Sequence, residues 1–297
     1  MSTGTDPLAP LAQLPGVPDA VAEVRKAVDR LYGHRVMRRR AAEVTSESAL
    51  RGARASAALA GADWPLEEVR RRSDFGADEE ARTVGAALRI AAEAGQLLSI
   101  WRHSPLQVLA RLHLLAVGDA DPTAGRPRQA GESAEELFPL ELEPVEGVDA
   151  APASAGPPAA LPPAPGVEEV AARLDQLSRL LVARAEGQGV GTPALVVASV
   201  VHGELLALRP FGAHNGVIAR AAQRIVLIAE GLDPKSICPA EVGFAELGTE
   251  SYRRALAGYL AGTPEGMAAW IDHCGRALRL GVRESTAVCE AMQRGMV

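Results

Sequence analysis

Apolar residues recur at three- and four-residue intervals along most of the chain, which is the spacing of an α-helix with one buried face. The first such run predicts a helix over residues 19–60, with Asp19 as its N-cap and an interruption at Gly33. Further helices are predicted over residues 78–100, 106–117, 167–186, 195–208, 218–229, 251–261 and 265–280. The pattern therefore predicts an all-α fold, a helical bundle without a sheet.

The stretch 195–208 differs from the others because it is apolar on nearly every side. A helix of this kind belongs in the centre of a bundle, and it is too short to cross a bilayer. It contains His202, which we expect to be a hydrogen-bonded core residue rather than a ligand.

Helical periodicity is lost between Gly118 and Gly166, where Pro, Ala and Gly dominate after residue 150. Such a composition buries too little apolar surface to order itself, so we expect a flexible, disordered insertion over 118–166. The resulting organisation is an N-terminal extension and helix (1–40), a helical domain (41–285) and a C-terminal tail (286–297).

Composition narrows the class of protein further. The chain is 47% hydrophobic but only 3% aromatic, which favours helix over sheet, and its net charge of −6 gives no general attraction to nucleic acid or to anionic membranes. No secretory signal is visible at the N-terminus, and Cys238, Cys274 and Cys289 are too few and too widely spaced for a disulfide framework or a zinc site. We therefore expect a cytoplasmic protein.

The most specific pattern lies between two predicted helices and reads R-P-F-G-A-H-N-G-V-I-A-R over residues 209–220. It resembles the signature of the Fic (Fido) family, H-P-F-x-[D/E]-G-N-G-R-x-x-R, whose members commonly transfer AMP from ATP to a hydroxyl of a target protein. The positions that match the signature are Pro210, Phe211, Asn215, Gly216 and Arg220.

The positions that differ are those that carry the chemistry in the family. Arg209 replaces the His that removes the proton from the target hydroxyl, and Ala213 replaces the carboxylate that holds Mg²⁺. His214 stands in place of the first Gly, and Val217 stands in place of a phosphate-binding Arg. Because a guanidinium stays protonated, Arg209 cannot serve as the base. The resemblance thus implies a degenerate AMP-transferase site with no metal ligand.

Phosphate binding can survive these replacements. Unpaired N–H groups at a helix N-terminus form a cradle for phosphate oxygens, and Asn215 and Gly216 occupy that place here. Arg220, one turn into the helix, can neutralise phosphate charge. These residues predict a site for ATP or another nucleotide that does not need Mg²⁺.

Other segments extend the resemblance. Residues 112–116 (L-H-L-L-A) and 125–128 (G-R-P-R) are similar to family elements that lead into the flap where targets dock, so the insertion is a candidate surface for a protein partner. Y-x-x-x-L at 252–256 and Trp270-Ile271 resemble patterns in the last helices of the family domain.

Residues 56–61 are similar to the family's inhibitory pattern [S/T]-x-x-x-E-[G/N], whose Glu pairs with the last Arg of the signature. Ser56 and Gly61 match it, but Ala60 replaces the Glu. The alternative is an Ala-rich helix end that Gly61 terminates.

Three functions remain open from the sequence. The first is a catalytically impaired module that binds a nucleotide or phosphate. The second is an active nucleotidyltransferase with a rearranged site, in which His214 and Arg209 take new roles. The third is a helical scaffold that binds no nucleotide and engages a protein partner.

Overall fold

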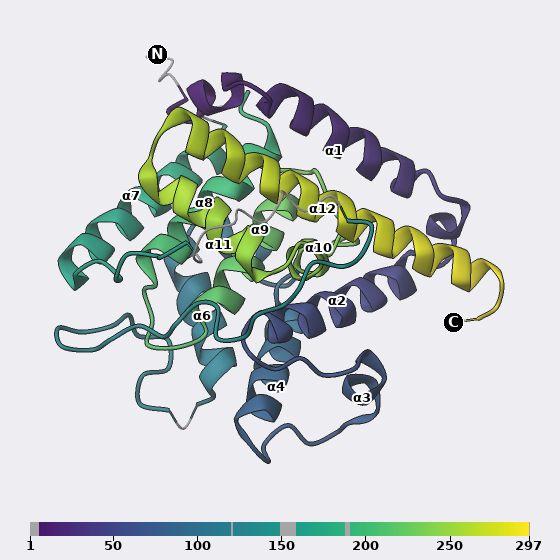
Figure 1. The fold of residues 1–297 in the computed structure, drawn as a ribbon, viewed down its shortest axis with the longest axis horizontal. Coiled ribbons are helices and arrows are strands. Elements are labelled where there is room, and N and C mark those ends of the chain that lie inside the picture. The colour runs from purple at the N-terminus through teal and green to yellow at the C-terminus, as the bar shows by residue number, and fades with distance from the viewer. Residues whose placement is uncertain (1–5, 120, 149–158, 188–190, 297) are drawn as a thin grey trace.

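The structure is a computed structural model that describes residues 6–119, 121–148, 159–187 and 191–296. Helices and irregular segments account for these residues, and no strand occurs among them, which confirms the all-α prediction (Figure 1). The α-helices are α1 (Val17–Tyr32), α2 (Ala41–Ala58), α3 (Leu66–Arg71), α4 (Glu79–Glu93), α5 (Leu98–Trp101), α6 (Pro105–Val117), α7 (Val167–Ala185), α8 (Ala194–Leu208), α9 (Asn215–Ala229), α10 (Ala240–Glu246), α11 (Thr249–Ala261) and α12 (Pro264–Gln293).

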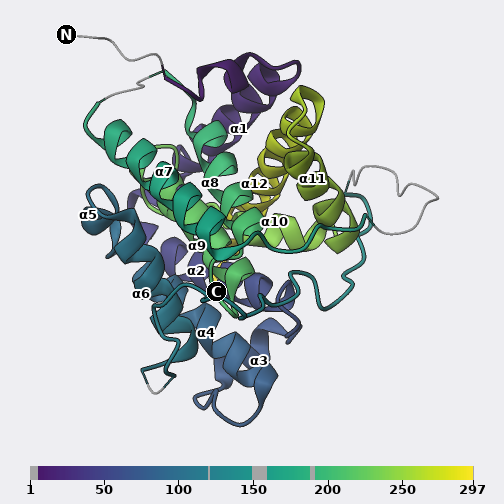
Figure 2. The ribbon, with the colours of Figure 1, turned by 90° about the vertical axis from the view of Figure 1, so that its left-hand side faces the viewer.

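The antiparallel pair α8 and α9 forms the centre of the molecule. Nearly every side chain of both helices is buried, as the all-round apolar pattern of residues 195–208 predicts. Helices α4 to α7 cover one side of the pair, and α11 and α12 cover the other (Figure 2). Among the described residues, no helix is both long and apolar enough to cross a membrane.

The longest helix is α12, which packs against α1, α8, α10 and α11 (Figure 1). It continues to Gln293, well beyond the predicted end at residue 280, so the proposed domain limit at residue 285 falls inside a continuous helix. Glycines allow the close approach of α10, because a Cβ on Gly243 would lie 2.0 Å from the backbone oxygen of Ala277.

Two helix starts were predicted from N-cap residues, and the structure confirms one of them. Asp78 is the N-cap of α4, and its Oδ1 accepts a hydrogen bond of 2.7 Å from the amide of Ala81. The prediction of Asp19 as an N-cap is wrong. Gly16, with a φ of 83°, precedes the first turn of α1, and the helix therefore begins before the proline at position 18 instead of after it.

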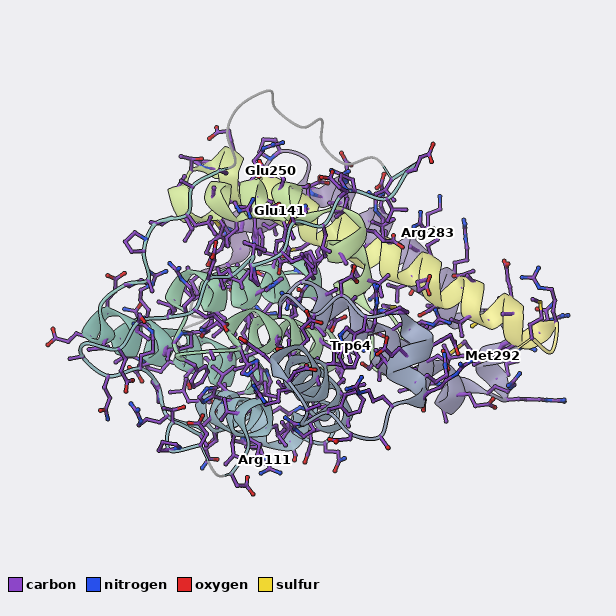
Figure 3. The ribbon with its side chains drawn as sticks, turned by 60° about the horizontal axis from the view of Figure 1, so that its bottom comes forward. Trp64, Arg111, Glu141, Glu250, Arg283 and Met292 are labelled. Atoms are coloured by element: carbon purple, nitrogen blue, oxygen red, sulfur yellow. The ribbon has the colours of Figure 1, made fainter. Side chains whose placement is uncertain are left out.

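Residues 118–119 and 121–148 contain no regular helix, but they contact the bundle at several points. Leu137 and Phe138 are buried, and the Phe138 ring contacts the edge of Tyr252 in α11 at 5.0 Å between centroids. Arg253 binds Glu141 of this segment as well as Glu250 of its own helix; Figure 3 shows both carboxylates at one edge of the molecule. Residues 159–165 are also irregular, and residues 149–158 lie outside the described residues.

The approach of α10 and α12 gives the first prediction. Gly243→Ala forces a methyl group against the α12 backbone, which cannot move away as a flexible side chain can. We expect the free energy of unfolding to fall by about 3 kcal/mol in urea titrations. Gly95→Ala is the matched control, because a Cβ there meets nothing within 4 Å. Equal midpoints for the two variants would contradict this account of the packing.

Candidate functional site

The signature forms the tight turn between α8 and α9. Two non-glycine residues in it adopt left-handed backbone conformations, Arg209 with a φ of 42° and His214 with a φ of 62°. His214 thus occupies a position that favours glycine, which is the residue of the family signature. The turn connects the two helices within six residues, and the first N–H groups of α9 have no partner within their own helix.

Asn215 closes this turn. Its Oδ1 accepts a hydrogen bond of 2.9 Å from the amide of Phe211, and its Nδ2 donates one of 2.8 Å to the Phe211 carbonyl. Asn215 is only 1% exposed, so the sequence expectation that it belongs to the phosphate cradle applies to its backbone and not to its side chain. The Phe211 ring stacks on His113 of α6, with 4.3 Å between centroids.

A carboxylate from the same chain occupies the N-terminus of α9. Glu135 Oε2 accepts a hydrogen bond of 2.6 Å from the amide of His214, and Glu135 Oε1 accepts another from the amide of Asn215. The Glu135 amide in turn donates to the Gly212 carbonyl at 3.0 Å. The first amides of α9 therefore hold a carboxylate of this chain, and the binding of an external phosphate there stays a prediction.

The electrostatics of Glu135 reflect two opposing effects. Burial raises the pKa of its carboxyl, while the amides of His214, Asn215 and Gly216 and the charge of Arg220 act in the opposite direction. Burial dominates, so the pKa lies above its usual value. The carboxylate is thus held by backbone amides and by a nearby positive charge, in a place where its desolvation is costly.

Arg220 is directed into the core and is 2% exposed. Its Nε donates to Ser56 Oγ and its Nη2 donates to the Ser56 carbonyl, both at 2.9 Å. The first residue of the degenerate inhibitory pattern therefore contacts the last Arg of the signature, although Ala60 offers no carboxylate. Gly61, just beyond α2, has a φ of 100° and lies against Pro139. Any contact of Arg220 with a phosphate stays a prediction.

Arg209 forms hydrogen bonds with two irregular segments of the chain, through its side chain and through its carbonyl group. Its Nη2 donates to the Pro162 carbonyl at 2.6 Å, and its own carbonyl accepts from Arg128 Nε at 2.8 Å. Burial, followed by the charge of Arg128, lowers the pKa of Arg209. The guanidinium therefore links the signature to the irregular segment that precedes α7.

The Mg²⁺ that the signature implies does not fit the residues present. The side chain of Ala213 is a methyl group, and both oxygens of the nearby Glu135 carboxylate accept hydrogen bonds from amides. Val217, which stands in place of a phosphate-binding Arg of the family signature, is 2% exposed, packs in the core and brings no charge to the site. Within the described ranges, no group of three or more His, Cys, Asp or Glu side chains could hold a metal ion.

His214 has a neutral imidazole at pH 7. Burial lowers its pKa to about 4, and His113 and Arg89 add to this effect while Asp121 opposes it. A base with so low a pKa accepts a proton poorly, since general bases work best near the operating pH. Its use as a relocated base stays a prediction.

The other family-like elements meet in space. The Gly125 amide donates to His113 Nδ1 at 3.1 Å, which joins the segments 112–116 and 125–128. The Tyr252 hydroxyl lies 2.6 Å from His202 Nε2, and Trp270 packs against both rings. Burial lowers the pKa of His202 well below its usual value, in agreement with its prediction as a core residue.

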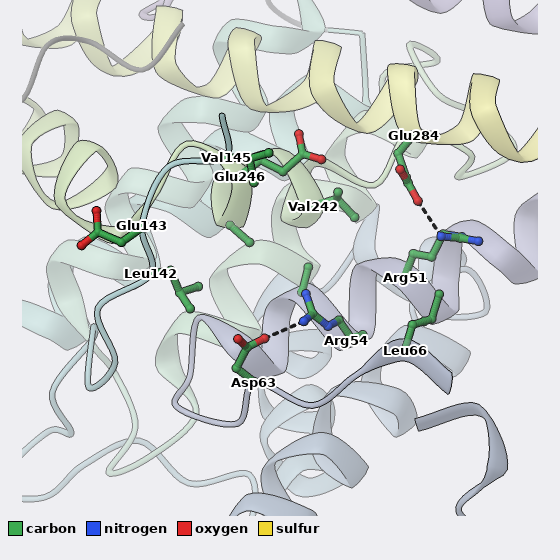
Figure 4. A pocket seen from close by; sticks show the side chains of 12 residues that line it. Arg51, Arg54, Asp63, Leu66, Leu142, Glu143, Val145, Val242, Glu246 and Glu284 are labelled. Atoms are coloured by element: carbon green, nitrogen blue, oxygen red, sulfur yellow. Dashed lines mark hydrogen bonds and ion pairs between the residues drawn. The ribbon is translucent and has the colours of Figure 1, made fainter. Parts of the chain in front are cut away.

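Cavities lie beside the signature but not over it. One of about 350 Å³ is bordered by Arg209, Arg253, Phe138 and Leu161, whereas a cavity of about 10 Å³ beside Ser56 and Val217 is too small for a nucleotide. A cavity of about 490 Å³ lies between α2, α10 and α12, and its walls contain the ion pairs Arg51–Glu284 and Arg54–Asp63 (Figure 4). No signature residue lines that cavity.

Sequence reasoning missed Glu135. The residue lies in a segment expected to be flexible, and its contacts reach across about eighty positions of the chain. One signal was available, because Leu137, Phe138, Leu140 and Leu142 form an apolar cluster directly after Glu135 and Glu136. Such a cluster indicates that this part of the insertion is anchored.

The buried contact between Arg220 and Ser56 gives a prediction about stability. Arg220→Ala removes both hydrogen bonds to Ser56, and we expect the free energy of unfolding to fall by about 1.5 to 3 kcal/mol. Arg179→Ala, which breaks an exposed pair with Asp175 on α7, should cost less than about 1 kcal/mol. Urea unfolding of both variants measures the difference. Similar losses in the two would show that the buried contact does not stabilise the fold.

His214 gives a prediction about pH. Because its folded pKa of about 4 lies below the unfolded value, the unfolded chain binds more protons between pH 6.5 and 4, and stability is lost as the pH falls through this window. His214→Asn removes the titrating group and tolerates the left-handed backbone. We expect its loss of unfolding free energy between pH 7 and pH 5 to be smaller than that of the wild type by about 1 to 2 kcal/mol. An unchanged pH dependence would contradict the burial of this imidazole.

Comparisons with known proteins agree with this geometry. No protein-family profile matches the sequence, and no curated protein matches it. Among solved structures, a Fic family protein from Desulfovibrio desulfuricans G20 is similar over 92% of this chain and 75% of its own, with a TM-score of 0.68 and 21% identity.

Two further structures show the same likeness. Fic-1 (residues 134–508) from C. elegans is similar over 93% of this chain and 73% of its own, with a TM-score of 0.60 and 14% identity. A Fic domain containing signaling protein from Bacteroides thetaiotaomicron VPI-5482 covers 92% of this chain and 97% of its own, with a TM-score of 0.60 and 12% identity. The chain therefore has the fold of Fic proteins.

Proposed function

We propose that this Fic-fold protein does not transfer AMP and instead binds a nucleotide or another phosphate-bearing ligand as a regulatory module. One observation carries the proposal: the amides of His214 and Asn215 hold an anion at the N-terminus of α9, whereas Arg209, Ala213 and Val217 supply none of the groups that the family uses for transfer. Anion binding and catalysis are thus separated in this site.

The missing groups act at different steps of the reaction. Loss of a general base alone costs about 10²- to 10⁴-fold in rate. Loss of a metal that stabilises phosphate charge removes several kcal/mol more from the transition state. Arg209 cannot substitute for the base, because its guanidinium has no acceptor nitrogen and already donates to the Pro162 carbonyl.

The ligand class follows from the cradle. Backbone N–H groups at a helix N-terminus favour phosphate and carboxylate oxygens over neutral groups, and no metal is needed for this interaction. The cavity beside Arg209 borders the same turn and offers room for the organic part of a small ligand. ATP, ADP and pyrophosphate are therefore suitable probes.

The first test of this function is a calorimetric titration. Pyrophosphate, ADP and ATP should bind with affinities that change less than about threefold when Mg²⁺ is replaced by a chelator, because Ala213 provides no metal ligand. Binding that requires Mg²⁺ would contradict the proposed site. Absence of binding both in the wild type and in Glu135→Ala, which removes the carboxylate from the α9 amides, would favour the scaffold alternative.

The second test concerns catalysis. The wild-type chain, incubated with labelled ATP and Mg²⁺, should transfer no AMP to itself or to general protein substrates above the background of a heat-denatured sample. Transfer by the wild type that His214→Ala abolishes, with circular dichroism showing an intact fold, would refute the proposal. That result would establish His214 as a relocated base.

A further inference from the structure

The segment around Glu135 is fastened to the signature turn before the carboxylate reaches the cradle. The Arg128 amide donates to the Pro210 carbonyl at 2.7 Å, and Arg128 Nε donates to the Arg209 carbonyl at 2.8 Å. We call residues 126–141 the arm. The arm therefore follows the turn from its start to the first residues of α9.

The arm is also anchored after Glu135. Leu137 and Phe138 are 6% and 5% exposed, and the Phe138 ring packs against Tyr252. Arg253 Nη2 then binds Glu141 at 2.6 Å. Since both sides are fixed independently of the carboxylate, the Glu135 side chain can leave the cradle without departure of the arm.

Glu135 is an unusual choice for a purely structural contact. Burial raises its pKa, and Arg220, whose charge acts in the opposite direction, donates its hydrogen bonds to Ser56. Its interactions with the His214 and Asn215 amides are those that a phosphate oxygen would make. The side chain thus imitates the class of ligand that the cradle accepts.

We propose that Glu135 is a built-in competitor for the anion site, and that the arm keeps the N-terminus of α9 closed until a phosphate-bearing ligand displaces this carboxylate. The proposal rests on the proposed function, because it assigns phosphate as the ligand. An internal ligand lowers the apparent affinity for an external one by the fraction of time that the cradle is empty. The closed state described by the structure is then the resting state.

The experiment compares Glu135→Ala with the wild type in the full chain. Pyrophosphate should bind the variant at least about tenfold more tightly in calorimetry, because the cradle no longer has an internal occupant. Hydrogen exchange at the amides of His214 and Asn215 should be at least about tenfold faster in the unliganded variant. Glu146→Ala, which removes an exposed carboxylate from the same irregular segment, should change neither quantity.

Each outcome bears on a different statement. Unchanged exchange and unchanged pyrophosphate affinity in Glu135→Ala would overturn the proposal. Faster exchange without pyrophosphate binding in any variant would support the closing contact but refute phosphate as the ligand, and the proposed function would fail with it. Glu135→Gln, which keeps the shape and removes the charge, repeats the measurement if the alanine variant does not fold.

Discussion

The site depends on the pair of hydrogen bonds between the Asn215 side chain and the backbone of Phe211. These bonds fix a short turn between two buried helices, and the turn sets the position of the first α9 amides, which donate to Glu135. Because α8 and α9 fill the centre of the bundle, the turn cannot shift without disturbing the core. The position of the amides that hold Glu135 is thus a consequence of how the core is closed.

The residues that match the Fic signature share a physical property. Phe211, Asn215 and Arg220 are almost fully buried, and each makes a contact that holds the fold together. Of the positions that differ, Arg209 and His214 are partly exposed residues of the turn, where replacement disturbs packing less, whereas Val217 is buried and apolar like its surroundings. A scaffold can therefore keep its signature in recognisable form after the reactive groups have been exchanged.

Periodicity predicted the existence of the long helices, because each buries a continuous apolar surface, but not all of their ends. The helix predicted over 78–100 is α4 and α5 with a break between them, and α12 continues to Gln293. Asp78 marked a helix start because its side chain caps α4. The short helices α3 and α10 were not predicted, since they contain too few residues to show a period. The position of Glu135 depends on the path of an irregular segment across the bundle, and the direction of Arg220 depends on where α2 places Ser56. The spacing of residues along the chain does not predict either of these contacts. Only the structure shows which groups surround the α9 amides and Arg220.

The arm also has a consequence for the two helix ends that it crosses. Arg128 brings a positive charge to the last carbonyls of α8, and Glu135 brings a negative charge to the first amides of α9. Each charge opposes the dipole of the helix that it meets, so one short stretch of chain compensates two macrodipoles of opposite direction. The charges of the arm therefore complement both helix ends at the turn, and because Arg128 is buried, salt screens this interaction less than it screens charges on the surface.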